Sequence, residues 1–258
     1  KTGWTAADVG EIVYQKDGSA LSAVPVDAGT YTAGITVGGQ TASVKYTIEK
    51  AAPTASDFTF AAPAGLTYDG NAKTATVEPN TGINGMGAVT VKYYQGDKPV
   101  EKPTNAGKYI VKISVEEGTN YNAAADLKIG ELTISKGTLD EGANKEATIR
   151  YSDTGVKTYT HTDFGFSEAG TFALNGSVTE GRNLLASGYP KFENDGVQVQ
   201  LATGLSLNGG EKKVVIPMTF TPDGGNYKPK EVTLTITLAD KATDTKTMIV
   251  TQKDFVYG

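Results

Sequence analysis

Alternating apolar and polar positions recur along this chain and predict β-strands. The clearest run is 232–238, where four aliphatic residues alternate with three threonines. Successive side chains of a strand point to opposite faces, so one face of this run suits a core and the other suits water. The same alternation predicts strands within 89–93, 109–115, 197–201 and 214–220. Turn pairs such as Asn84-Gly85 and Asp223-Gly224 lie between the runs and favour antiparallel hairpins.

Composition adds little that favours helices. The chain has 31 glycines and is 38% hydrophobic, which is typical of strands joined by tight turns. The one alanine-rich stretch, 121–128, has no long apolar face, so we expect a loop or a single helical turn there. The sequence therefore predicts an all-β fold.

Internal repeats divide the chain into modules. The segment Pro25–Tyr31 recurs as Pro103–Tyr109, with the shared pattern Pro-x-(Asp/Asn)-Ala-Gly-x-Tyr and a period of 78 residues. A second pattern, Gly-x-Asn-Tyr, occurs at 118–121 and 224–227. A strand followed by Lys ends each of three segments, at Lys50, Lys136 and Lys241.

These repeats predict tandem small antiparallel β-modules, each an Ig-like sandwich or β-grasp-like fold with its own core, in an elongated arrangement. The expected divisions are a partial module at 1–50, a complete module at 51–136 and a divergent module at 137–241. Residues 242–258 are expected to be the start of a next repeat or a tail. Both ends look cut, so we expect an excerpt from a longer array.

Four motifs together resemble a known family. Tyr68-Asp-Gly70, the strand 89–94 and the two repeated patterns at 103–109 and 118–121 are similar to MBG/YDG-type tandem repeats of bacterial cell-surface proteins. The resemblance covers 58–136 well and 1–50 in part, whereas 137–241 is similar to the Ig-like modules that accompany such repeats. It implies cell-envelope display and adhesion or spacer roles, and it supplies no catalytic residues.

Charge and residue types argue against several function classes. The net charge is −5 and Arg150 and Arg182 are the two arginines, so nucleic acid is not an expected partner. The sequence contains no run of roughly 18 apolar residues, so we expect no membrane insertion in this segment. The chain has no cysteine and one histidine, His161, which we place on a polar strand face or in a loop. We expect no enzyme activity, no metal site and no cofactor.

Aromatic side chains are the candidate ligand contacts, because exposed rings stack on sugars. Tyr93 and Tyr94 are adjacent in a predicted strand, so one of them should be exposed, and Trp4 and Tyr189 are the other candidates. Four further tyrosines recur at fixed motif positions and are expected to pack, with the hydroxyl hydrogen-bonded to the backbone: Tyr31, Tyr109, Tyr121 and Tyr227. A calcium site in the Asp/Asn/Gly turns and a Lys–Asn isopeptide cross-link stay open.

The sequence thus favours a non-enzymatic, extracellular repeat region of a bacterial surface protein that acts as a stalk or spacer and displays other domains. The alternative is an adhesin module that binds a glycan or a host or microbial surface protein through exposed aromatics. We expect a monomer located outside the cell, at the cell surface or in the cell wall.

Overall fold

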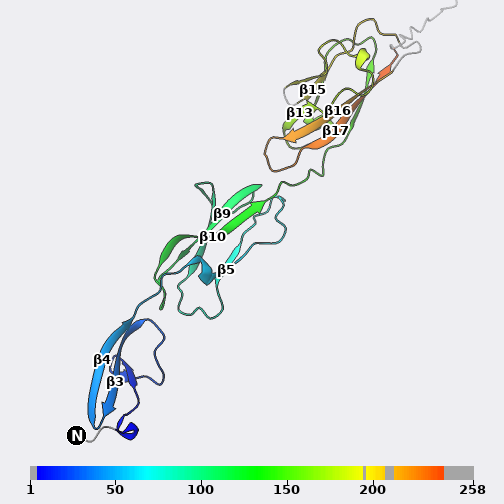
Figure 1. Cartoon of the computed structure of the whole chain (residues 1–258). Coiled ribbons are helices and arrows are strands. Elements are labelled where there is room, and N and C mark those ends of the chain that lie inside the picture. The colour runs from blue at the N-terminus through cyan, green and yellow to red at the C-terminus, as the bar shows by residue number, and fades with distance from the viewer. Residues whose placement is uncertain (1–4, 194–195, 207–211, 241–258) are drawn as a thin grey trace, which may run out of the picture. The chain divides into compact units, whose positions relative to one another are not determined.

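The computed structural model describes residues 5–193, 196–206 and 212–240, and it consists of small β-sheets with a few short 3₁₀ helices (Figure 1). This confirms the all-β prediction. The chain divides into two compact units, Lys1–Ser135 and Lys136–Gly258. The finer division into modules remains a prediction, and its last part, 242–258, lies outside the described residues.

The first predicted module contains one four-stranded antiparallel sheet, in the order β2-β1-β3-β4. Gly18, Gly38 and Gly39 have positive φ angles and close its two hairpins. A 3₁₀ helix, η1, at Ala6–Asp8 precedes the sheet. The strands are β1 (Val13–Lys16), β2 (Ser19–Ala20), β3 (Gly29–Val37) and β4 (Gln40–Ile48).

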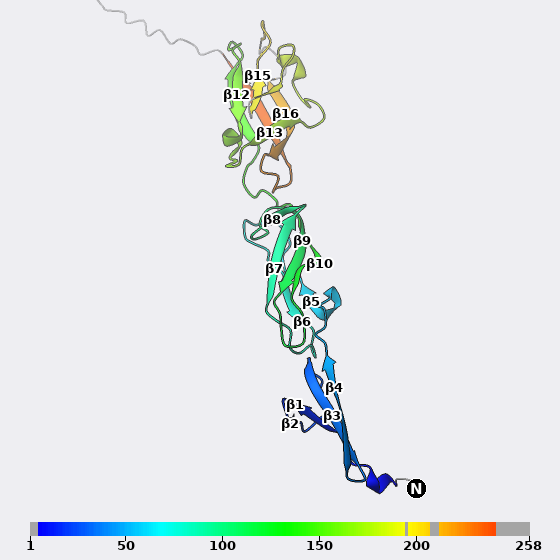
Figure 2. The ribbon, with the colours of Figure 1, turned by 90° about the vertical axis from the view of Figure 1, so that its left-hand side faces the viewer.

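The second predicted module has a sheet of the same kind and a second layer. The four-stranded sheet has the order β10-β9-β7-β8, and a two-stranded sheet, β5-β6, accompanies it (Figure 2). Helix η2 (Ala55–Asp57) leads into the smaller sheet. The strands are β5 (Phe58–Ala61), β6 (Thr76–Pro79), β7 (Val89–Gln95), β8 (Lys98–Val100), β9 (Gly107–Val115) and β10 (Ala124–Ile134).

The unit Lys136–Gly258 contains two sheets, β11-β17-β16-β13 and β12-β15-β14. Its helices are η3 (His161–Phe164) and η4 (Arg182–Leu184). The strands are β11 (Lys145–Arg150), β12 (Lys157–Thr160), β13 (Gly170–Leu174), β14 (Lys191–Glu193), β15 (Gly196–Val199), β16 (Lys213–Pro222) and β17 (Lys230–Ala239).

One strand pair departs from the purely antiparallel expectation. Strands β11 and β17 pair in parallel, with Ala147 opposite Ile236. Parallel partners need a long connection between them, and 79 residues separate the end of β11 at Arg150 from the start of β17 at Lys230. Turn signals between neighbouring strands could not reveal this pairing, because it joins the first and last strands of the unit.

The expectation of a loop or helical turn at 121–128 is wrong for its second half. Strand β10 begins at Ala124 and pairs with β9, although its register shifts between Ala124 and Leu127. Asp126 has a φ of 53°, which marks an irregularity that lets the strand continue. Pairing with β9 therefore outweighs the helical preference of three alanines.

In the modules that contain two sheets, the apolar residues at alternating strand positions form the hydrophobic cores. In β16 and β17 the alternating aliphatic residues, together with Met218 and Phe220, are buried, and they join one cluster with residues of β15. In the second module the buried residues of β9 and β10 form two smaller clusters, one of which includes Phe58 and Val77. None of these clusters combines residues from both units.

The first module differs from the expectation that each module has its own core. Among its described residues, 5–50, Tyr31 is the one buried hydrophobic side chain. Several large aliphatic side chains remain exposed, including Ile12 and Val44. Within residues 5–50 no second sheet layer covers the four strands, so the alternating face cannot become a closed interior.

Candidate functional site

Tyr93 lies in the core of the second module and has no surface for a ligand. Its side chain is 5% exposed. Its hydroxyl accepts a hydrogen bond from the Ala75 N–H at 2.8 Å and donates one to the Ala75 carbonyl at 3.3 Å. Burial raises the pKa of the Tyr93 phenol. The adjacent Tyr94 is therefore the member of this pair that solvent reaches.

The other candidate aromatics do not gather into one site. The Tyr94 ring lies 4.7 Å from the Lys112 ammonium, and its hydroxyl is 3.4 Å from an Asp126 carboxylate oxygen. Tyr189 is half-buried and belongs to the other unit, while Trp4 lies outside the described residues. Ligand binding by these residues stays a prediction.

Two of the four repeated tyrosines, Tyr31 and Tyr109, have the expected structural role. The Tyr31 hydroxyl donates to the Asp27 carbonyl at 2.9 Å, and the Tyr109 hydroxyl donates to the Asn105 carbonyl at 2.7 Å. Both rings are nearly fully buried. This confirms packing plus a backbone hydrogen bond at the two Pro-x-(Asp/Asn)-Ala-Gly-x-Tyr motifs.

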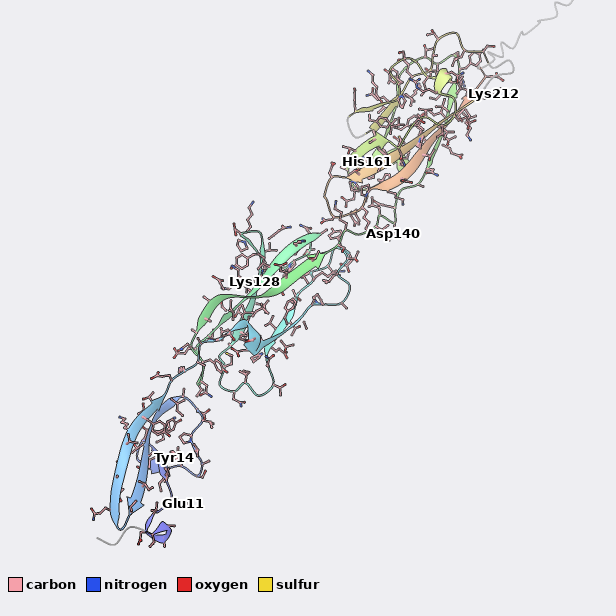
Figure 3. The ribbon with its side chains drawn as sticks, in the orientation of Figure 1. Glu11, Tyr14, Lys128, Asp140, His161 and Lys212 are labelled. Atoms are coloured by element: carbon pink, nitrogen blue, oxygen red, sulfur yellow. The ribbon has the colours of Figure 1, made fainter. Side chains whose placement is uncertain are left out.

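The described residues hold few groups suited to catalysis or metal binding. Across 5–193, 196–206 and 212–240, no three His, Cys, Asp or Glu side chains lie close enough together to hold a metal ion. His161 is the first residue of η3 (Figure 3), and its Nδ1 atom is buried without a hydrogen-bond partner in the described part of the chain. No helix in that part is long and apolar enough to cross a membrane.

Lys73 is the buried charged residue of the second module. Its side chain is 9% exposed, and its ammonium group donates to the Asp69 carboxylate at 2.6 Å. Its backbone N–H donates to the Pro103 carbonyl at 2.8 Å. The lysine therefore links the Tyr68-Asp-Gly70 motif to the start of the repeated Pro103 motif. Its side chain pairs with a carboxylate, and the isopeptide cross-link stays an open question.

This ion pair makes the stability of the second module depend on pH. The hydrogen bond from Lys73 lowers the pKa of Asp69 below 3.8, its value in an unfolded chain. A lowered folded-state pKa stabilises the fold above pH 3.8, and the contribution is lost as the pH falls through the folded-state value. We expect Asp69→Asn to reduce the loss of stability between pH 6 and pH 3, measured by amide hydrogen exchange of residues 51–135. Asp97→Asn, at an exposed turn, is the control, and an equal effect of both variants would contradict the assignment.

The short linker between the first and second modules is hydrogen-bonded into the second. Ala51 forms a parallel bridge with Tyr121. The Ala51 N–H donates to the Asn120 carbonyl, and the Asn122 N–H donates to the Ala51 carbonyl, both at 2.9 Å. The Asn122 side chain also donates to the Lys50 carbonyl at 3.2 Å. Little of the chain between β4 and this bridge is left unrestrained.

The side chain of Asn120 contacts both modules. Its Oδ1 atom accepts from the Ala28 N–H at 2.8 Å, and its Nδ2 group donates to the Asp27 carboxylate at 2.8 Å. The same Nδ2 group lies 3.3 Å from the Asn84 carbonyl of the second module. Asn120 thus joins the Pro25–Tyr31 motif of one module to the Gly118–Tyr121 motif of the next. We call this set of contacts the Asn120 joint.

An ion pair and a cavity also lie at the Asn120 joint. Lys50 and Glu117 form an ion pair, and the hydrogen bond from Lys50 lowers the pKa of Glu117. A largely polar cavity of about 330 Å³ lies at the joint, with Asp27 and Asn120 in its lining. Tyr31 supports the arrangement, since its hydroxyl bond to the Asp27 carbonyl holds the loop that faces Asn120.

The sequence revealed both motifs but not their contact. Asp27 and Asn120 are 93 positions apart, and no spacing rule connects them. The available signal was a polar residue at the same place in each copy, Asp27 and Asn105 in one motif and Asn120 and Asn226 in the other. The unit Lys136–Gly258 repeats the backbone part, because Gly137 bridges Tyr227 in parallel and its N–H donates to the Asn226 carbonyl at 2.9 Å.

Solved structures similar to this chain are extracellular β-proteins, at very low similarity. Drosophila N-cadherin EC1-3 is 13% identical, with 85% of this chain and 80% of that chain covered and a TM-score of 0.24. The immunoglobulin domains 1-5 of Sidekick-1 are 8% identical, with coverage of 91% and 53% and a TM-score of 0.24. A Bacteroides ovatus glucan-utilization protein, SGBP-B, solved with a mixed-linkage heptasaccharide, is 14% identical, with coverage of 89% and 61% and a TM-score of 0.16. These values support no argument about function.

No curated protein matches the chain. A family model does match, over residues 59–138, and it is that of the MBG domain. The matched segment contains the buried Tyr109, the Lys73–Asp69 pair and the loop that carries Asn120. The resemblance drawn from the four sequence motifs is therefore confirmed: residues 59–138 of this chain match the MBG domain.

Proposed function

We propose that this chain is a non-enzymatic repeat region of a bacterial surface protein, located outside the cell, and that it acts as a stalk or spacer. The observation that carries the proposal is the Asn120 joint. A spacer extends its cargo only if successive modules do not fold back on each other. The joint opposes such bending, because the linker is paired with the second module and one side chain bonds to both.

The MBG match over 59–138 supports the surface-repeat part of the proposal. The outer faces of the sheets support solubility, since threonines alternate with buried residues along β17. Display outside the cell fits a chain without cysteine, which has no thiol to oxidise. Each of these features is common to many extracellular β-modules, whereas the joint bears directly on how far two successive modules can bend.

Removing the Asn120 side chain should loosen the joint without unfolding either module. Asn120→Ala deletes the bonds to Ala28 and Asp27, and each such bond contributes about 0.5–1.5 kcal/mol. Because the chain has no cysteine, spin labels at Thr41→Cys and Lys98→Cys give one defined pair. We expect pulsed electron spin resonance to show a narrow distance distribution that broadens in Asn120→Ala.

Thr119→Ala is the matched control. Thr119 is exposed and adjacent to Asn120 in the same loop, so its removal should leave the distribution unchanged. A parent chain whose distance distribution is already as broad as that of Asn120→Ala would argue against a spacer.

The adhesin alternative remains a prediction for the exposed aromatics. Tyr94 and Tyr189 retain accessible surface, and each has a lysine ammonium within 6 Å of its ring. That arrangement is common on protein surfaces and names no ligand.

A further inference from the structure

Three lysines stand side by side on the larger sheet of the second module. Lys92 of β7 lies opposite Lys112 of β9, and Lys112 lies opposite Lys128 of β10, which is labelled in Figure 3. Directly opposite residues of neighbouring strands share one face of the sheet. With neighbouring strands about 4.8 Å apart, the three positions span roughly 10 Å across the sheet. We call Lys92, Lys112 and Lys128 the lysine row.

The lysine row lies on the sheet face that is turned away from the core. Tyr93 and Val111, which are next in sequence to Lys92 and Lys112, are buried in the core. Successive side chains of a strand point to opposite faces, so the lysines point outward. The side chains of Lys92 and Lys128 are accordingly 41% and 56% exposed.

The sheet does not need these charges in order to fold. The sheet of the first module has the matching strand order, and Gly34 precedes Lys112 by the 78-residue period of the repeated motif. Gly34 lies between Val13 and Ser43 on the neighbouring strands, so the same three positions are uncharged there. Like charges directly opposite each other destabilise a sheet. A binding role therefore explains the lysine row better than packing does.

An aromatic ring and a carboxylate lie beside the lysine row. The Lys112 ammonium is 4.7 Å from the centre of the Tyr94 ring. The Tyr94 hydroxyl donates to the Asp126 carboxylate at 3.4 Å, and the Lys92 ammonium is 3.6 Å from the same carboxylate. Because Tyr94 and Lys92 belong to β7 and Asp126 to β10, these side chains reach across β9.

The charges of this face add up to a positive excess. The Lys128 ammonium pairs with the Glu131 carboxylate at 2.8 Å, and this hydrogen bond lowers the pKa of Glu131. The whole chain has a net charge of −5, so a local positive excess is the part of it that attracts anions. On β7, β9 and β10 the outer face has four lysines and two carboxylates: Lys92, Lys108, Lys112, Lys128, Asp126 and Glu131.

We propose that this face binds a linear acidic polysaccharide of the polyuronate class. The lysine row pairs with carboxylates that recur along the polymer. The Tyr94 ring packs against the C–H face of a sugar. Asp126 and Glu131 accept hydrogen bonds from sugar hydroxyls. A single exposed ion pair is weak, so the affinity comes from several contacts made by one polymer.

The carboxylates on this face favour a sugar over other polyanions. A polyphosphate or an acidic peptide chain offers charge, but it has no row of hydroxyls to satisfy Asp126 and Glu131, which repel it instead. Arginine, the residue best suited to phosphate recognition, does not occur in 51–136. A polyuronate carries both the carboxylates that lysines attract and the hydroxyls that carboxylates bind.

The test titrates the whole chain with a linear oligomer of galacturonic acid. We expect saturable shifts of the amide resonances of 90–94, 110–114 and 126–131, and an affinity that falls as salt is added. The fully methyl-esterified oligomer keeps the sugar rings and loses the charge, so it should not bind. No saturable shift with the acid, or equal binding of the ester, would overturn the proposal. Equal or tighter binding of oligoglutamate or inorganic polyphosphate would overturn the choice of a sugar.

Lys112→Gln removes the central charge of the lysine row and should weaken binding by about tenfold or more. Lys92→Gln changes a more exposed position and should also weaken binding, which guards against a local folding defect at residue 112. Lys45→Gln is the matched control, because it makes the same change of net charge at an exposed site on β4. Unchanged affinity in both row variants would overturn the proposal. So would an equal loss in Lys45→Gln, because net charge alone would then control binding.

Discussion

The Phe220→Ala variant is expected to destabilise the unit Lys136–Gly258 by about 3–5 kcal/mol and to leave the unit Lys1–Ser135 folded. Phe220 is 0% exposed and stacks on Phe166, with ring centroids 4.0 Å apart. Phe172 packs against the same ring at 5.0 Å. Truncation would therefore open a cavity at the centre of an aromatic cluster, in a domain whose total stability is about 5–15 kcal/mol.

The effect should be confined to one unit because the buried clusters do not mix residues of the two. Hydrogen exchange read by mass spectrometry resolves this directly, since peptides from each unit report separately. Thr221→Ala changes the next residue on the exposed face of β16 and should shift stability by less than about 0.5 kcal/mol. Equal loss of protection in both units of Phe220→Ala would show that they unfold as one.

The aromatic cluster also shows what hydrophobic patterning cannot predict. Phe220 and Phe172 lie in strands, and Phe220 was part of the alternation that predicted β16. Phe164 and Phe166 lie in and just after η3, where there is no period of two. Their burial depends on a chain path set by Gly165, which has a φ of 77°. Residues in irregular segments reach a core through such local geometry, which a single sequence does not reveal.

The Asn120 joint was unpredictable for a different reason. The patterns around Asp27 and Asn120 were recognised as repeats, and the tyrosine beside Asp27 was assigned a structural role that the structure confirms. Repetition indicates that a position matters in every copy, but it does not distinguish a contact within a module from one between modules. Such a distinction needs the coordinates of two successive copies.

The incomplete core of the first module was predictable in part. The repeats predict a partial module at 1–50, but they do not show which strands its core lacks. Strand β3 shows the same alternation as β9, although a strand was predicted from this pattern in β9 alone. Burial depends on the second layer as well as on the strand itself. Residues 58–61 and 76–79 supply that layer for one copy, and residues 5–50 contain no counterpart.

The Gly118→Ala variant is expected to destabilise the second module by about 3 kcal/mol and to loosen the Asn120 joint as well. A Cβ atom at residue 118 would lie 2.2 Å from the Gly85 carbonyl oxygen and 2.5 Å from the Gly87 nitrogen. Both obstacles are backbone atoms, so no side-chain rotation relieves the overlap, and the loop must move. The same loop places Asn120 against Asp27. Urea unfolding measures the first effect, and the spin-label distances at residues 41 and 98 measure the second.

Gly224→Ala is the matched control, because Gly224 holds the same place in the second Gly-x-Asn-Tyr motif. A Cβ atom there would have no neighbour within 4 Å, so we expect a change of less than about 1 kcal/mol. The two glycines thus hold the same motif position, but a Cβ atom would meet backbone atoms at Gly118 and open space at Gly224. A loss of stability as large in Gly224→Ala as in Gly118→Ala would mean that the motif requires glycine for its backbone conformation. Close approach of the 85–87 loop would then not be the reason for Gly118.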